Sequence, residues 1–211
     1  MPDLHFEIIG AAPVRDMATP ALAFDLRVSN NGREPVRAVL LRCQIQIETA
    51  RRRYSAGEQD QLRDLFDEPQ RWGQTLRPLL WINASVNVPA FTEGIVYPIS
   101  VPCTYDLNVP VTKYFHALAG DTVPLTFLFS GTVFYEADRL QAAPISWNKE
   151  AHYRLPVQVW KDLMDLYYPD VTCLCLRRDV VNELYRFKVR EGIPTFEEAI
   201  LRMCHEHSNS R

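Results

Sequence analysis

The chain has 211 residues, of which 47% are hydrophobic and 23% are charged, a balance typical of a folded globular protein. A formal net charge of −3 argues against a general nucleic-acid-binding protein, which would carry an excess of lysine and arginine. The acidic start of the chain and the lack of a long apolar run predict a cytoplasmic protein with no membrane association. Five cysteines in that compartment are expected to stay reduced, with no disulfide.

One stretch, VPLTFLFSGTVFY at 123–135, dominates the pattern of the chain. Its alternate residues from Val123 to Phe129 are apolar and predict one buried face of a long β-strand. A strand of this kind needs a second sheet to cover it, which predicts a sandwich. Gly131 interrupts the apolar face and predicts either a bulge or a close approach of another backbone segment.

Alternating apolar and polar residues predict the remaining strands. We place them at 4–9, 22–29, 39–48, 79–88, 94–101, 109–117, 145–147 and 153–155. The Asn30-Asn31-Gly32 turn predicts that 22–29 and 39–48 are paired in one sheet. These two strands resemble the paired strands of immunoglobulin-like domains.

Helical spacing of apolar residues predicts a short helix at 58–67, across the edge of the sandwich. The same spacing of Val159 and Leu163 predicts a second helix, which ends before Pro169. Between the strands and the first helix, Arg51, Arg52 and Arg53 are interpreted as a solvated loop. The fold class is therefore mainly β: an immunoglobulin-like β-sandwich over 1–168, with a strand-helix-helix C-terminal appendage over 169–211.

The appendage begins with a predicted strand at 171–177. Asp179 is expected to cap a helix that runs to Glu191, and Gly192 ends it. Thr195 and Glu198 have the spacing of a capping box, which predicts the start of a second helix.

The segment VTCLCLRRDVVNELYRFKVREGIPTFEEAILRMC resembles the ribbon-helix-helix unit of bacterial repressors. That resemblance implies a dimer whose strands read DNA bases, for which polar side chains are needed. Here the strand offers Thr172, Leu174 and Leu176 on one face and two cysteines on the other. We therefore expect a homodimer without DNA contact, joined through residues 172–176, Leu184 and Ile200. Docking of the strand on its own sandwich is the alternative.

Metal-binding and catalytic patterns are weak. Four residues of the appendage could in principle surround a metal ion, namely Cys173, Cys175, Cys204 and His207. They lack the Cys-x-x-Cys spacing of zinc knuckles, so we expect no metal and no cofactor. Cys103, Asp106 and His116 lie close in sequence, but catalytic triads are assembled by geometry, and we expect no catalytic residue.

Exposed aromatic residues often mark protein interfaces. Trp147 and Trp160 stand in short, charged segments bounded by prolines. We predict that both tryptophans belong to an interface, whereas the other aromatic residues lie in the core.

Four segments together resemble a bacterial family of unknown function: CTYDLNVPVTKYFHAL, PLTFLFSGTVFY, SWNKEAHYRLPV and LRRDVVNELYRFKVREGIPTFEEA. The resemblance implies an association with gene clusters for nickel-iron uptake hydrogenases. We predict a non-catalytic accessory or protein-interaction protein, which supports a complex of the hydrogenase type and whose partner is unknown. The alternatives are a transcription regulator that acts through the appendage, and a small-molecule-binding or hydrolytic sandwich.

Overall fold

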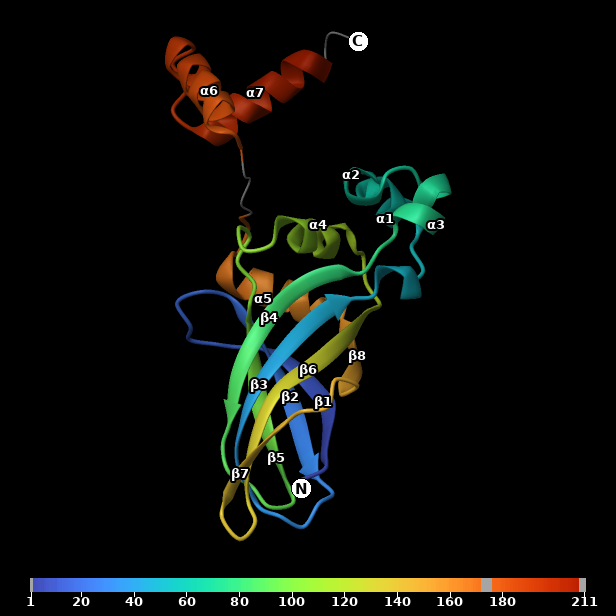
Figure 1. Ribbon diagram of the computed structural model, residues 1–211. Coiled ribbons are helices and arrows are strands. Elements are labelled where there is room, and N and C mark those ends of the chain that lie inside the picture. Colours follow the sequence, from blue (N-terminus) through green and yellow to red (C-terminus); the bar gives the residue numbers. More distant parts are fainter. Residues whose placement is uncertain (1, 172–175, 209–211) are drawn as a thin grey trace. The chain divides into compact units, whose positions relative to one another are not determined.

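The computed structural model describes residues 2–171 and 176–208 (Figure 1). Contacts between residues divide the chain into two compact units, 1–171 and 172–211, and each is described by itself. The sequence places the boundary at 168/169. Strands make up 39% of the chain and helices 32%, so the fold is mainly β, as predicted.

The first unit contains two antiparallel sheets. The three-stranded sheet has the order β1-β2-β5, from β1 (Leu4–Pro13), β2 (Ala21–Asn30) and β5 (Gly94–Pro102). The five-stranded sheet has the order β4-β3-β6-β7, and β8 also pairs with β6. Its strands are β3 (Val36–Ile47), β4 (Leu79–Val88), β6 (Thr122–Glu136), β7 (Leu140–Pro144) and β8 (Glu150–Pro156).

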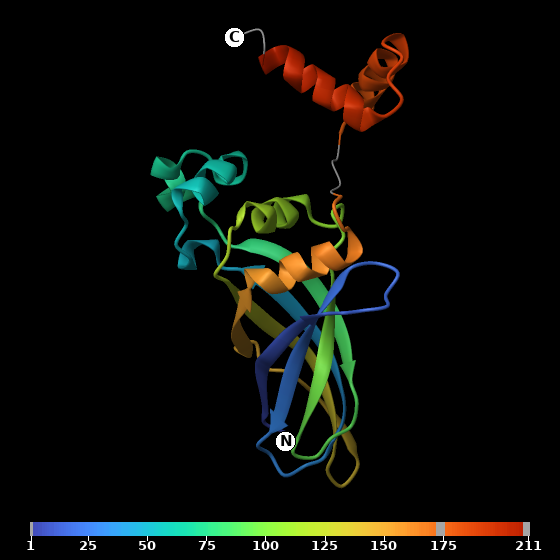
Figure 2. The same ribbon diagram turned by 180° about the vertical axis from the view of Figure 1, so that it is seen from behind.

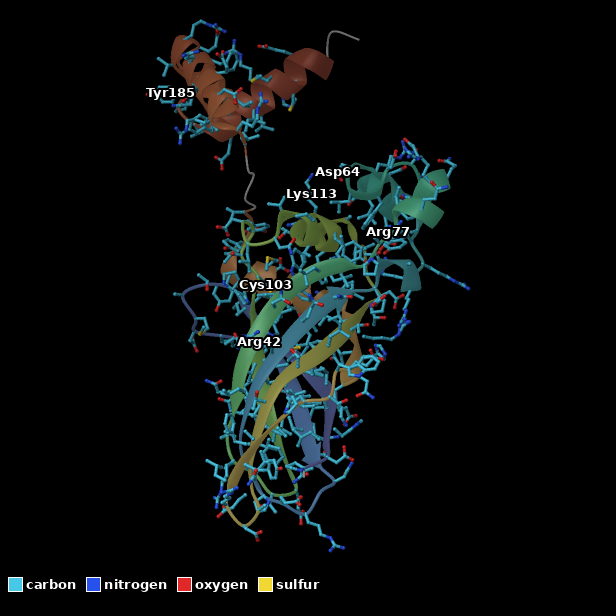
Figure 3. The ribbon with its side chains drawn as sticks, viewed as in Figure 1. Arg42, Asp64, Arg77, Cys103, Lys113 and Tyr185 are labelled. Carbon is cyan, nitrogen blue, oxygen red and sulfur yellow. The ribbon has the colours of Figure 1, made fainter. Side chains whose placement is uncertain are left out.

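Short helices form the link between β3 and β4, and two longer helices follow β5 and β8. The link holds the 3₁₀ helices η1 (Thr49–Arg51) and η2 (Pro69–Arg71), together with α1 (Ala56–Gln61), α2 (Arg63–Phe66) and α3 (Trp72–Thr75). In the views from front and back, α4 (Val109–Ala117) and α5 (Val157–Tyr167) lie at one end of the two sheets (Figure 2). An ion pair between Lys113 and Asp64 joins α4 to α2 (Figure 3).

The core lies between the two sheets, and β6 supplies its centre. Phe127 and Phe129 are buried, as predicted. The ring of Phe127 packs edge-on against Phe24 of β2, with 5.2 Å between the centroids. The ring of Phe129 stacks on Phe6 of β1 at 4.6 Å. The apolar face of the long strand is therefore covered by the second sheet, for the reason that its pattern indicated.

Gly131 is a point of close backbone approach, one of the two predicted possibilities. Its φ is +140°, a region that residues with a side chain rarely adopt. A Cβ built there would lie 2.0 Å from the carbonyl oxygen of Leu40 on β3. Only glycine therefore allows β6 and β3 to pair at this position.

The predicted pairing of the second and third strands is wrong, because β2 and β3 belong to different sheets. The link between them is held by Asn30, whose side chain is buried. Its Oδ1 accepts hydrogen bonds from the backbone N–H groups of Asp3 and Gly32, at 3.2 and 3.0 Å. Its Nδ2 donates to the carbonyls of Glu34 and Thr92, at 2.9 and 3.1 Å. These bonds satisfy the amide and fix a crossover where the sequence indicated a hairpin.

The strand predicted at 109–117 is also wrong, since these residues form α4. The side chain of Asn108 accepts a hydrogen bond from the N–H of Val111 and so caps the helix. The next residues include a proline in the first turn, where its missing N–H costs nothing. Val111 and Phe115 are four residues apart, a spacing that fits one face of a strand and one face of a helix equally well. The cap at Asn108 favours the helix.

Arg52 does not belong to a solvated loop, which corrects the interpretation of the arginine run. Its side chain is 4% exposed and donates to the carboxylate of Glu58, which is 6% exposed, at 2.8 Å. Arg52 also donates to the carbonyls of Gly120 and Thr122, at 2.6 and 3.2 Å. Glu58 accepts a further hydrogen bond from the N–H of Ala119 at 3.0 Å. The pair therefore attaches the helical link to the chain that leads into β6.

The second unit holds α6 (Arg178–Arg190) and α7 (Phe196–Ser208). Gly192 follows α6 with a φ of +64°, consistent with its predicted role as a stop. Asp179 lies in the first turn of α6, and the cap position is taken by Arg177 instead. Of the strand predicted at 171–177, residues 172–175 lie outside the described residues, and the flanking residues that are described are not in a strand.

Candidate functional site

The outer face of the five-stranded sheet carries a hollow of ≈ 640 Å³. Its floor is formed by neighbouring parts of β3, β4 and β6, and Trp147 stands at its side. The polar side chains that line it are those of Arg42, Gln44, Asn83, Ser85 and Ser130. Figure 3 labels Arg42 on the sheet that faces the viewer.

The register of the strands explains the hollow. Arg42 of β3 lies opposite Ser85 of β4 on one side and Ser130 of β6 on the other. Directly opposed residues on neighbouring strands are close enough for their side chains to touch. Because both neighbours are serines, the long arginine side chain is flanked by space and by two hydroxyl groups.

Trp147 lies in the link between β7 and β8, where strand pairing along β6 is interrupted. Residues 145–147, predicted as a strand, instead belong to the link between β7 and β8. Both ends of this link are bonded to β6. The N–H of Ile145 donates to the carbonyl of Gly131, and the N–H of Phe129 donates to the carbonyl of Lys149, each at 2.9 Å. Trp147 is 92% exposed, and its place in an interface stays a prediction.

Arg42 is the one charged side chain that lines this hollow in the described part of the chain. Within the described residues it has no ion pair and no side-chain hydrogen bond, unlike Arg27, which pairs with Glu7 at 2.8 Å. The acidic residue registered beside the hollow is Glu150, opposite Leu128. Its carboxylate lies 3.5 Å from Nε2 of His152. The guanidinium of Arg42 is therefore available to a ligand.

A smaller hollow of ≈ 320 Å³ lies further along the same sheet, beside β6 and β8. Three of its polar side chains contact one another. The hydroxyl of Thr126 donates to Oε1 of Glu48 at 3.0 Å and lies 3.2 Å from Nδ1 of His152. Among residues 2–171 and 176–208, no group of three or more potential ligands is placed to hold a metal ion.

Trp160 is not an interface residue of the first unit, which corrects the prediction. It is 4% exposed, its ring stacks on Phe115 at 5.2 Å, and it meets His116 edge-on at 5.0 Å. The residue lies on α5 at a position that turns inward. The polar residues that flank it in sequence lie on other faces of the helix, and this helical periodicity indicates a buried position for Trp160.

The structure does not assemble the Cys103, Asp106 and His116 trio into a hydrogen-bonded relay within the described residues. Cys103 is buried, and its thiol donates to the carbonyl of Val101 at 3.3 Å. Burial raises the pKa of Cys103 to about 12, so the thiol stays protonated at neutral pH. Burial, and then the charge of Lys161, lowers the pKa of His116. A protonated thiol is a poor nucleophile.

The helices of the second unit expose much of their apolar surface. Tyr185 of α6 is 56% exposed and Ile200 of α7 is 38% exposed, while Leu184 is partly buried. In the described part of this unit, Ala199 is the one fully buried residue. Further exposed apolar residues are Val180, Val181, Val189, Phe196, Leu201 and Met203. Two short helices bury little surface by themselves, so much of the apolar surface of this unit stays exposed within it.

Of the other residues predicted for the interface, Leu176 is exposed. Thr172 and Leu174 lie outside the described residues. The two helices contact each other where Tyr185 approaches Phe196, with ring centroids 6.4 Å apart. Lys188 lies over the ring of Phe196 and donates to the carbonyl of Pro194 at 3.1 Å.

Comparison with known proteins gives one match over the whole length. A model described as a family of unknown function, DUF6084, matches residues 1–211. No curated protein matches the chain. Across the described residues, no helix has the length and apolar character needed to cross a membrane.

Two solved structures show distant similarity. A Bordetella pertussis protein described as ApaA is 13% identical with a TM-score of 0.32, over 73% of this chain and 93% of that one. A β-glucosidase from Kluyveromyces marxianus is 13% identical with a TM-score of 0.27, over 72% of this chain and 15% of the enzyme. Both TM-scores are below 0.5, so neither similarity supports an argument about fold or function.

Proposed function

Because the chain belongs to the DUF6084 family, whose function is unknown, we propose from its own surfaces that it is a non-catalytic interaction protein that forms a homodimer through its C-terminal helices. The observation that carries the proposal is the uncovered apolar face of α6 and α7. Chains in solution rarely leave this many large apolar side chains of one small unit uncovered.

A second copy of the chain is the partner that fits this face best. Around the apolar residues, α6 ends in basic Lys188 and Arg190, and α7 begins with acidic Glu197 and Glu198. A surface with both signs of charge can be complementary to itself in a two-fold dimer. Two such helix pairs would form a four-helix arrangement that buries Leu184 and Ile200 from each copy.

Subunit exchange tests the dimer directly. Tagged and untagged full-length chains are mixed, and the untagged chain should co-purify with the tagged one. The double variant Leu184→Glu, Ile200→Glu should abolish co-purification, because it buries carboxylates in an apolar interface. Arg186→Gln, an exposed charge on α6, is the matched control and should leave co-purification intact. Co-purification that survives the double variant would contradict the proposal.

The accessory role in a hydrogenase-type complex and the immunoglobulin-like arrangement of the sandwich are finer parts of the same proposal. Both rest on resemblances in the sequence. The regulator alternative depends on the segment around Thr172 and Leu174, which lies outside the described residues. A shift of DNA by the full-length protein at physiological salt would favour that alternative.

A further inference from the structure

The hollow on the five-stranded sheet carries an inference that is independent of the proposed dimer. We propose that it binds a small organic monocarboxylate that carries a flat apolar ring. Three features of the hollow support this proposal. Arg42 has no partner in the described part of the chain, Ser85 and Ser130 flank it, and the exposed Trp147 lines the same ≈ 640 Å³ of space.

The charge of the ligand follows from Arg42. A guanidinium presents two parallel N–H groups that match the two oxygens of a carboxylate. Among the described residues that line the hollow, Arg42 supplies one positive charge and no side chain supplies a negative one. A singly charged carboxylate is balanced by that charge. A doubly charged phosphate usually draws on more cations or on a helix N-terminus.

Polar contacts beside Arg42 fix the orientation of the carboxylate. Ser85 and Ser130 lie on the two neighbouring strands in register with Arg42, so their hydroxyls flank the base of the arginine side chain. Gln44 lies two residues further along β3, opposite Asn83. The Oε1 of Gln44 accepts a hydrogen bond from Nε2 of Gln46 at 3.1 Å, which leaves its Nε2 as a donor. The amide of Asn83 can both donate and accept, which suits a polar substituent on the ring.

Trp147 supplies the apolar part of the site. A side chain that is 92% exposed loses little by rotating against a ligand, and it gains the burial of its indole. Its backbone is held by the bonds of Ile145 and Lys149 to β6, so the indole is attached to a fixed edge of the sheet. A ring that stacks on Trp147 would cover the open side of the hollow.

Calorimetric titration of the full chain with 2-naphthoate tests the proposal. We expect saturable binding of one molecule of 2-naphthoate per chain. Binding should be at least about tenfold weaker for 2-naphthamide, which has the ring but no charge, and for acetate, which has the charge but no ring. Arg42→Gln should weaken binding of 2-naphthoate by about tenfold or more. Arg27→Gln, an exposed arginine of the other sheet, is the matched control and should leave binding unchanged.

Tryptophan fluorescence gives a second readout. Trp72, Trp81 and Trp160 are buried, so quenching by 2-naphthoate should come from Trp147 and vanish in Trp147→Ala. Melting temperatures check that the variants fold. Three results would each overturn the proposal: no saturable binding of 2-naphthoate, equal binding by Arg42→Gln, or tighter binding of 2-naphthyl phosphate than of 2-naphthoate.

Discussion

The guanidinium of Arg52 and the carboxylate of Glu58 form a buried ion pair at 2.8 Å, within the helical link between β3 and β4. The same two side chains bond backbone groups at 119–122, where the chain enters β6. This pair therefore connects a short helical segment to the strand at the centre of the core. Its removal should affect the stability of the whole first unit.

Replacing Arg52 with methionine should lower the free energy of unfolding by roughly 3–5 kcal/mol, because it leaves the buried carboxylate of Glu58 without a counter-charge. Arg53, the next residue, is exposed, and Arg53→Met should change stability by no more than about 0.5 kcal/mol. Urea denaturation of the two variants at neutral pH measures both values. Equal stability of the two would show that the buried pair is dispensable.

Glu58 should also make stability depend on pH. Burial raises its pKa, but hydrogen bonds from Arg52 and from the N–H groups of Ser55 and Ala119 outweigh burial and lower the pKa to about 2. The pKa of an unfolded glutamate is about 4.3. Because the folded pKa is the lower one, this contribution is complete above about pH 4.3 and is lost as the pH falls toward 2.

The free energy of unfolding should therefore fall more steeply over that acidic range in the native chain than in Glu58→Gln. Urea denaturation at a series of acidic pH values checks this difference. Parallel curves for the two proteins would mean that Glu58 is not the group responsible.

Gly131→Ala should destabilise the first unit by at least about 2 kcal/mol, because the new methyl group meets the Leu40 carbonyl and the backbone has a positive φ. Gly57 has no atom within 4 Å of a built Cβ and lies in α1. Gly57→Ala should leave stability unchanged or raise it by up to about 1 kcal/mol. Thermal melting compares the two, and a similar melting temperature for both would refute the close approach.

Trp160 and Trp147 should respond in opposite ways to truncation. Trp160→Ala removes a buried ring that stacks on Phe115 and should cost roughly 3–5 kcal/mol. Trp147→Ala removes an exposed ring and should cost no more than about 0.5 kcal/mol. Denaturation curves of both variants measure the difference. A large loss for Trp147→Ala would mean that its indole packs in the fold.

Strand positions could be predicted well where one face of the strand is exposed to solvent, because apolar and polar residues then alternate. The pattern at 79–88 matches β4, which spans Leu79–Val88. The sheet to which each strand belongs could not be predicted, because the Asn30 crossover depends on bonds to Asp3 and Thr92, far away in the sequence. Likewise, the alternation in α4 fits a strand until the cap at Asn108 is considered.

The site was harder to predict than the fold. The charged, proline-bounded surroundings of Trp147 predict an interface residue; the structure shows that the residue is exposed, and its place in an interface stays a prediction. For Arg42, the alternation of apolar and polar residues predicts only a solvent-exposed position on a strand. The two serines that make room for it come from β4 and β6. The register that brings them beside Arg42 depends on the pairing of three strands and cannot be deduced from the sequence of one of them. An arginine opposite small residues indicates a candidate binding site only when the pairing of its strand with the neighbouring strands is known.

The mass of the full-length protein in solution tests the central claim most directly, because the proposed interaction begins with self-association of the C-terminal helices. Light scattering over a range of micromolar concentrations should give twice the 24.4 kDa of one chain. The double variant Leu184→Glu, Ile200→Glu should give 24.4 kDa under the same conditions. A native chain that stays at 24.4 kDa at every concentration would contradict the account.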